Sequence, residues 1–271
     1  MKCLIISGSP SKQYQWGSKV IEGFTGQLVS EVKAEMSRLG KVSFDEIRLG
    51  DVNLPYCKGC HGCFTKGESH CPHAAIFQPI IQKIHEADCV ILTSPVYAVN
   101  VSALVKGFFD LGAYNHHRPC FFTKKALVVS STAGAYAKKI CGYMRNEFLQ
   151  WGFNRVYTLS VIRRGAGEPT LKMKTACRNV AMQLYNDTAS GKLHNPSFSQ
   201  VFFYQLWRNF TKNIKNSADY VYWHESELGK HEFAPMVKLS VSKRLSGKML
   251  NSLLGQLLKK ASLLGDTEVE N

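Results

Sequence analysis

Four of the nine cysteines in this 271-residue chain lie in one short loop rich in Cys and Gly. Cys57, Cys60, Cys63 and Cys71 form the pattern C-x2-C-x2-C-x7-C. Two consecutive C-x2-C steps let three thiolates converge on one face of a metal centre, and a fourth can arrive from the following turn. Because the cysteines are clustered and odd in number, they indicate metal or redox chemistry in a reducing compartment. We therefore expect a cytoplasmic protein.

Three states of this loop, residues 54–73, are compatible with the spacing. The four cysteines could hold a [4Fe–4S] cluster, or the loop could carry no metal. Zinc is the third alternative, with cysteines and His61, His70 or His73 as its ligands. The residues by themselves leave these alternatives open.

A second candidate site follows the first apolar run, residues 2–7. Ser7-Gly8-Ser9-Pro10 comes directly after it, with Lys12 close behind and Gly17-Ser18-Lys19 at the start of a predicted helix over 18–39. A helix N-terminus offers unpaired N–H groups, and small hydroxyl residues let a phosphate come close. An ordinary strand-to-helix turn is the alternative. The segment is neither a Walker A sequence nor G-x-G-x-x-G, which argues against a P-loop nucleotidase and a Rossmann enzyme.

Two further loops follow buried apolar runs. Ser94 to Asn100, S-P-V-Y-A-V-N, combines a rigid turn with an aromatic side chain and exposed backbone amides. Ser130 to Ala135, S-S-T-A-G-A, supplies small residues that let the backbone approach a ligand. The first loop suits one edge of a flat ring and the second suits the other edge.

Alternating strands and helices must position these loops. Strands are predicted at residues 2–7, 42–47, 89–93, 126–130 and 156–161, and helices at 18–39, 74–87, 102–111, 136–151 and 169–186. Such alternation predicts an α/β fold with a five-stranded parallel, doubly wound sheet over residues 1–190. Ligands are expected beyond the carboxyl ends of the strands.

Residues 191–271 break this alternation and predict a C-terminal, mainly helical, aromatic-rich extension. Leucine and methionine recur at helical spacing over 245–264, with Lys259 and Lys260 on the opposite side. This amphipathic helix could pack on the domain, on a partner subunit or at a lipid surface. We expect packing, with the extension capping the pocket of a neighbouring subunit in a homo-oligomer, rather than membrane contact.

The remaining features have simpler interpretations. Cys3, Cys89, Cys141 and Cys177 fall in strand and helix patterns and are assigned to the core. Residues 115–118, N-H-H-R, are expected to form a polar loop. The formal charge of +14 comes from dispersed lysines and arginines, which favours anionic cofactors over nucleic acid. No apolar run is long enough to span a membrane.

Together, the three loops resemble those of NAD(P)H-dependent FMN reductases and flavodoxin-like oxidoreductases, over roughly residues 1–185. The cysteine motif resembles that of the iron–sulfur flavoproteins, in which a compact motif before the second helix binds a [4Fe–4S] cluster close to FMN. The resemblance implies a flavodoxin-like fold. It also implies that the FMN phosphate is bound by Ser9, Lys12, Gly17 and Ser18. The ring would lie against Pro95, Val96, Tyr97 and Ala98, and the pocket would be completed by Thr132 and Gly134. The resemblance further implies that the cluster is bound by Cys57, Cys60, Cys63 and Cys71.

The function implied by this resemblance is an FMN-dependent oxidoreductase. It would take hydride from NAD(P)H and pass electrons to a quinone, another small acceptor or an iron–sulfur centre. One alternative is an electron carrier that exchanges electrons with ferredoxin-like partners and binds no nicotinamide. A non-redox module without flavin is another. Few side chains need be catalytic, because the flavin supplies the chemistry and backbone donors near Tyr97 and Thr132 would stabilise negative charge on reduced FMN.

Overall fold

The computed structural model describes residues 1–10, 13–16, 19–164 and 167–264, and it confirms the predicted parallel sheet. Five strands pair in the order β4-β1-β5-β6-β7, and every pairing is parallel. This is the flavodoxin-like order, with β1 beside the third strand of the sheet along the chain. The strands are β1 (Lys2–Ser7), β4 (Ser43–Arg48), β5 (Cys89–Pro95), β6 (Lys125–Thr132) and β7 (Arg155–Ile162).

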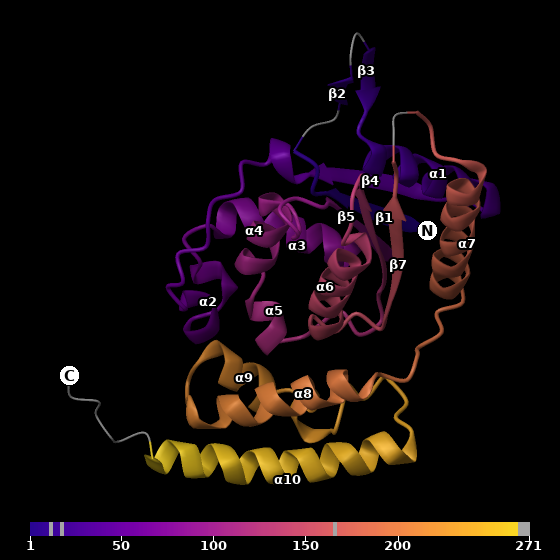
Figure 1. Ribbon diagram of the computed structural model, residues 1–271. Coiled ribbons are helices and arrows are strands. Elements are labelled where there is room, and N and C mark those ends of the chain that lie inside the picture. The colour runs from indigo at the N-terminus through magenta and orange to yellow at the C-terminus, as the bar shows by residue number, and fades with distance from the viewer. Residues whose placement is uncertain (11–12, 17–18, 165–166, 265–271) are drawn as a thin grey trace.

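Helices cover both faces of the sheet (Figure 1). In β1, Leu4 and Ile6 contribute to one core and Cys3 and Ile5 to the other, because successive side chains of a strand point to opposite faces. The first core is completed by α3 (Ala74–Glu86), α4 (Ala103–Leu111) and α6 (Ala137–Gln150), and the second by α1 (Phe24–Leu39) and α7 (Leu171–Ala189). The four cysteines assigned to the core are buried, as predicted.

The prediction that the first helix begins at Ser18 was wrong. Strand β2 (Gln13–Trp16) pairs antiparallel with β3 (Lys19–Glu22), and α1 begins only at Phe24. The hairpin projects beyond the edge of the sheet (Figure 1). Its aromatic and β-branched residues favour a strand, and this preference outweighs the helical spacing of the apolar residues that follow. Lys12, Gly17 and Ser18 lie outside the described residues.

The C-terminal extension packs at the end of the sheet where the strands begin (Figure 1). Asn154, just before β7, exchanges two hydrogen bonds with the backbone of His194, and Gln200 donates to the Phe153 carbonyl. The extension contains α8 (Phe198–Phe210), α9 (Ala218–His224), α10 (Val241–Leu264) and the 3-10 turns η3 (Thr211–Asn213) and η4 (Glu227–Lys230). The predicted amphipathic helix thus starts four residues earlier than expected. No helix in the described part of the chain is long and apolar enough to cross a membrane.

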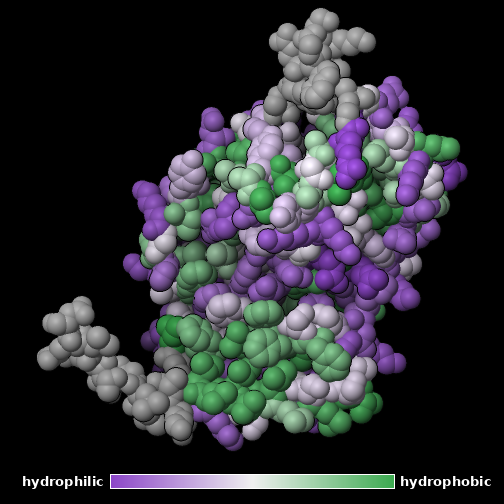
Figure 2. All heavy atoms as spheres, viewed as in Figure 1, coloured by the Kyte–Doolittle hydropathy of each residue, from purple (hydrophilic) through white to green (hydrophobic). Residues whose placement is uncertain are grey.

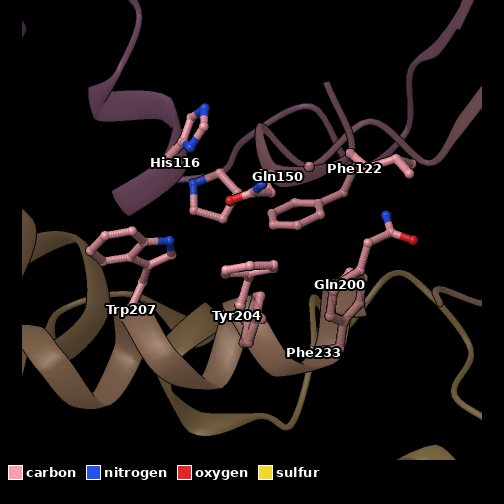
Figure 3. A pocket seen from close by; sticks show the side chains of 11 residues that line it. His116, Phe122, Gln150, Gln200, Tyr204, Trp207 and Phe233 are labelled. Atoms are coloured by element: carbon pink, nitrogen blue, oxygen red, sulfur yellow. The ribbon is translucent and has the colours of Figure 1, made fainter. Parts of the chain in front are cut away.

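Aromatic side chains join the extension to the domain. Tyr204 of α8, Trp223 of α9 and Phe233 pack with Phe122, which precedes β6. A cavity of about 10 Å³ remains between α8 and the domain, as Figure 3 shows, which is close to the smallest space that holds a water molecule. Trp207 borders it, and its indole N–H is buried without a hydrogen-bond partner. The extension therefore has its own apolar core, continuous with the domain through Phe122.

Candidate functional site

The loop after β1 is held against β5 by direct backbone contact. The Gly8 N–H donates to the Thr93 carbonyl over 2.9 Å, and the Ser102 hydroxyl donates to the Gly8 carbonyl over 2.7 Å. A Cβ atom on Gly8 would lie 2.1 Å from a Val105 methyl group, so only glycine fits. Ser9, assigned to phosphate binding, follows directly and is half-buried. The loop is therefore fixed by residues of β5 and the start of α4.

The loop after β5 turns sharply at residues predicted to lie against a ring. Tyr97 and Asn100 exchange two backbone hydrogen bonds of 2.9 Å, and the turn between them has φ of 45° at Ala98 and 65° at Val99. Left-handed backbone at a β-branched residue is a genuine outlier that costs on the order of 1–3 kcal/mol. Such strain collects at binding sites. Tyr97 is half-exposed at this turn, whereas Pro95 and Val96 are partly buried below it.

The loop after β6 lies next to this turn, because the Val96 N–H donates to the Ser131 carbonyl over 3.2 Å. Thr132 accepts a hydrogen bond from the Gly134 N–H, 3.1 Å away. No atom lies within 4 Å of the place where a Cβ on Gly134 would be, so protein packing does not require a glycine there. The sequence analysis missed Tyr136, which is half-exposed with φ of 74° at the end of this loop.

The start of α1 is compatible with an anion, as predicted for the N-terminus of the first helix, but Arg163 beside it was not predicted. Neither a capping side chain nor an acidic residue satisfies its first turn, although Thr25 shares a 2.6 Å hydrogen bond with Ser131. Arg163 follows β7, and its guanidinium lies 4.3 Å from the centre of the Phe24 ring. This side chain is only 8% exposed, yet its Nη2 has no hydrogen-bond partner. A buried cation beside a helix N-terminus that no side chain caps is suited to an anion.

A signal for this site was present in the sequence. Arg163 and Arg164 come directly after the last apolar strand, at the sheet edge where ligands are expected. The two arginines differ in the structure, since Arg163 is buried and Arg164 is exposed. Which of them faces α1 depends on the register of β7, and the charge pattern alone does not reveal it.

The cysteine loop brings its four predicted ligands to one cavity. The loop follows the 3-10 turn η1 (Leu49–Asp51) and contains α2 (Gly62–Thr65) and the turn η2 (Glu68–His70). All four cysteines are free thiols that line a cavity of about 360 Å³. Burial, followed by the neighbouring Cys71, raises the pKa of the Cys63 thiol to about 11. Within the described residues, no group of three or more His, Cys, Asp or Glu side chains is arranged to hold a metal ion.

The donor set of this cavity nevertheless suits a thiolate-bound centre. Four cysteines from one loop are the usual ligands of a [4Fe–4S] cluster, and they also suit zinc. His73 lines the same cavity, and its Nε2 is buried without a hydrogen-bond partner. The residues that line this cavity therefore fit a thiolate-bound centre in their chemical type and in sharing one cavity.

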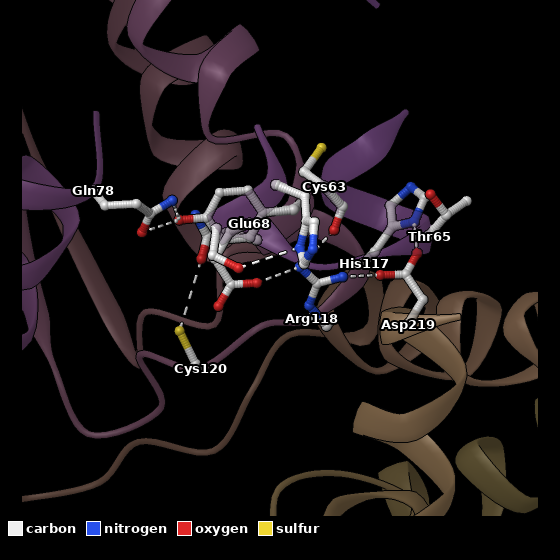
Figure 4. A network of polar contacts seen from close by, with 12 residues as sticks. Cys63, Thr65, Glu68, Gln78, His117, Arg118, Cys120 and Asp219 are labelled. Carbon is white, nitrogen blue, oxygen red and sulfur yellow. Dashed lines mark hydrogen bonds and ion pairs between the residues drawn. The ribbon is translucent and has the colours of Figure 1, made fainter. Parts of the chain in front are cut away.

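A polar network holds the inner end of the cysteine loop (Figure 4). Arg118 donates to the Cys63 carbonyl over 2.9 Å and to Glu68 over 2.8 Å, and it also pairs with Asp219 of α9. The second carboxylate oxygen of Asp219 lies 2.6 Å from His117 Nδ1. Asp219 thus links two residues of the domain with the extension.

The predicted polar loop over residues 115–118 was wrong. A short helix, α5 (Tyr114–His117), occupies most of it, and its residues are largely buried. The His117 ring is sandwiched between Phe64, 4.1 Å away, and Trp207 of α8, 3.8 Å away. Partners more than 50 residues away along the chain account for this burial, so local composition does not reveal it.

Helix α4 connects the two candidate sites. Its N-terminal cap, Ser102, bonds to the loop after β1, whereas Asp110 and Leu111 at its other end line the cysteine cavity. Nine helical residues span roughly 14 Å at 1.5 Å per residue. The cysteine cavity and the loops at the carboxyl edge therefore lie at opposite ends of one short helix.

Comparison with known proteins agrees with this architecture. Residues 1–167 match the family of NADPH-dependent FMN reductases. The chain belongs to this family. As a member of it, the protein is an FMN-dependent oxidoreductase that uses a reduced nicotinamide.

Individual relatives are similar over different shares of the chain. The chain is 28% identical over 235 residues to an iron-sulfur flavoprotein of Archaeoglobus fulgidus, covering 83% of this chain and 98% of the relative. It is 38% identical over 110 residues to an iron-sulfur flavoprotein of Methanocaldococcus jannaschii, covering 41% and 51%. A solved azoreductase of Bacillus anthracis has a TM-score of 0.50 at 16% identity, covering 69% of this chain and 99% of that one, and shares the fold.

Proposed function

We propose that this reductase binds FMN across the carboxyl ends of β1, β5 and β6, with its phosphate at the start of α1. The observation that carries this proposal is the buried, unpartnered Nη2 of Arg163 beside the uncapped helix. A phosphate there would pair with the guanidinium and with helix N–H groups. Ser9 and the hydroxyl of Thr25 would complete the phosphate site, and the predicted residues Lys12, Gly17 and Ser18 remain candidates.

The isoalloxazine ring would lie between the strained loop after β5 and the open loop after β6. Pro95, Val96, Tyr97 and Ala98 would border one side, and Thr132 and Gly134 the other. Backbone strain at Ala98 and Val99 is typical of a binding loop, and the empty space beside Gly134 leaves room for a ligand. FMN held by these loops would supply the hydride and one-electron transfer chemistry, with NAD(P)H as the donor.

Titration of FMN into apoprotein tests the phosphate site. Replacing Arg163 by alanine should weaken FMN binding about 10- to 100-fold, because a hydrogen bond to a charged group contributes about 1.5–3 kcal/mol. Exposed Arg164 provides the matched control, and Arg164→Ala should leave the affinity unchanged. Equal affinities for wild type and Arg163→Ala would remove Arg163 from the site.

We further propose that Cys57, Cys60, Cys63 and Cys71 hold a [4Fe–4S] cluster that receives electrons from the flavin. Four free thiols on one cavity support this, as do the names of relatives that are called iron-sulfur flavoproteins. The route along α4 is short, and a quinone, another small acceptor or a ferredoxin-like protein would be the final acceptor. A carrier that exchanges electrons only with protein partners is the second candidate, and the same cysteine cavity supports it.

Metal analysis of anaerobically purified protein tests the cluster. Iron and acid-labile sulfide at about four each per chain are expected. Cys60→Ser should lose the iron but keep FMN, and Cys120→Ser, outside the loop, should keep both. Zinc in place of iron, or no metal, would contradict the cluster while leaving the flavin site intact. Anaerobic bleaching of the flavin by NADPH then separates a reductase from a carrier that binds no nicotinamide.

A further inference from the structure

The outward face of α10 carries an apolar stripe that nothing in the described structure covers. Five large side chains recur every fourth residue and are all exposed, from 53% at Leu253 to 76% at Val241. The stripe consists of Val241, Leu245, Met249, Leu253 and Leu257. Scattered apolar residues are normal on a surface, but a contiguous row along a helix indicates a binding face.

The opposite face of α10 is firmly attached to the extension. Leu254 is buried, Asn251 accepts a 3.0 Å hydrogen bond from Asn209, and a Cβ on Gly247 would lie 2.8 Å from the Cβ of Glu232. The helix therefore does not need to bury its stripe in order to fold. The stripe is available to a partner while the inner face remains packed.

The apolar surface continues from α10 onto α8. Lys243 bridges the two helices, with its ammonium 5.5 Å from the Phe198 ring centre and 3.1 Å from the Asn195 side chain. Phe198 and Phe202 of α8 are themselves exposed. Figure 2 shows hydrophobic residues gathered over the extension, in contrast to the hydrophilic surface of the sheet domain above it.

The charge of α10 indicates which kind of partner could cover its apolar stripe. The 24-residue segment contains five cations and no acidic residue, namely Lys243, Arg244, Lys248, Lys259 and Lys260. Arg244 and Lys248 are exposed beside the stripe. In a two-fold dimer this face would meet itself and bring like charges together, with no carboxylate on the helix to offset them. An anionic surface would attract the exposed Arg244 and Lys248 instead of repelling them.

We propose that α10 docks this protein on an anionic lipid surface, with the stripe in the interfacial region and the cations against lipid phosphates. A basic helix with a continuous apolar face lies in the plane of such an interface and does not cross it. This reverses the expectation that the helix serves packing alone. The inference is independent of the flavin site and of the cluster.

Vesicle flotation of the full-length protein tests the proposal. Vesicles of phosphatidylcholine with an equal part of phosphatidylglycerol should bind the protein, pure phosphatidylcholine should not, and high salt should release it. Leu245→Glu combined with Met249→Glu should weaken binding at least about 10-fold. Arg244→Gln combined with Lys248→Gln should weaken it about 5-fold for each cation. Leu171→Glu, an equally exposed leucine on the sheet domain, is the matched control and should bind normally.

Three results would overturn the proposal. The first is equal binding to both vesicle types, or a Leu245→Glu/Met249→Glu variant that binds anionic vesicles as tightly as the wild type does. The second is a dimer in light scattering that ignores vesicles and becomes monomeric in that variant, because a second copy would then cover the stripe. The third is a monomer that binds neither vesicle, which would leave the face to a soluble partner. Unchanged flavin content and circular dichroism in each variant exclude misfolding as the cause.

Discussion

The two candidate sites are built in different ways. At the carboxyl edge of the sheet, backbone geometry makes the site: Gly8 is pressed against Val105, and Ala98 and Val99 adopt left-handed conformations. At the cysteine loop, side chains from distant parts of the chain make it, through Arg118, His117 and Asp219. The first site is held by elements of the sheet domain, whereas the second also depends on Asp219 of the extension.

This difference predicts that the cysteine loop is more sensitive to changes in the extension than the flavin loops are. Asp219→Ala removes a buried carboxylate and leaves the buried Arg118 with only Glu68 as counter-ion. We expect a loss of about 3–5 kcal/mol in the free energy of unfolding, measured by urea denaturation, since breaking a buried ion pair leaves an uncompensated charge. Metal content should fall as well.

The matched control for this change is Glu227→Ala, which breaks an exposed pair with Lys230 in the same extension. It should leave the unfolding midpoint unchanged, because exposed ion pairs contribute little. If Asp219→Ala lowered both the metal content and the affinity for FMN, the extension would hold both sites. The predicted difference between the two sites would then be wrong.

Two glycines of the flavin loops give the next largest effect. Gly8→Ala places a methyl group in contact with Val105 and the Thr93 carbonyl, and it should destabilise the apoprotein by about 1–3 kcal/mol. Gly134→Ala meets no neighbour and should leave apoprotein stability unchanged while weakening FMN binding. Thermal denaturation of both apoproteins with parallel FMN titrations measures the contrast. A destabilised Gly134→Ala apoprotein would show that packing, not ligand space, requires that glycine.

The smallest effect is expected at the strained turn. Val99→Gly relieves a φ of 65° at a β-branched residue and should raise the unfolding free energy of the apoprotein by up to about 1 kcal/mol. FMN binding should weaken, because the loop is then less rigid. Val96→Gly, in the same loop but outside the left-handed region, should instead destabilise the protein. A lower unfolding free energy for the Val99→Gly apoprotein than for wild type would mean that the turn stores no strain.

The sheet and the loops at its carboxyl edge could largely be predicted from the sequence. Strands β1 and β5 are short apolar runs that end beside Gly8 and at Pro95, and Ser9, Pro95 to Ala98, Thr132 and Gly134 lie at the predicted edge. The spacing of Cys57, Cys60, Cys63 and Cys71 likewise brought them to one cavity. Local periodicity carries this information because neighbouring residues share one element.

Three features depend on tertiary contacts: where α1 starts, which arginine after β7 is buried, and what holds the cysteine loop. The hairpin β2–β3 replaces a predicted helical turn because strand pairing overrides the apolar spacing. Arg163 faces Phe24, and Asp219 faces Arg118 across about a hundred residues. Contacts of this kind depend on packing between elements, which leaves no periodic trace in the chain, and they position the groups on which both candidate sites depend.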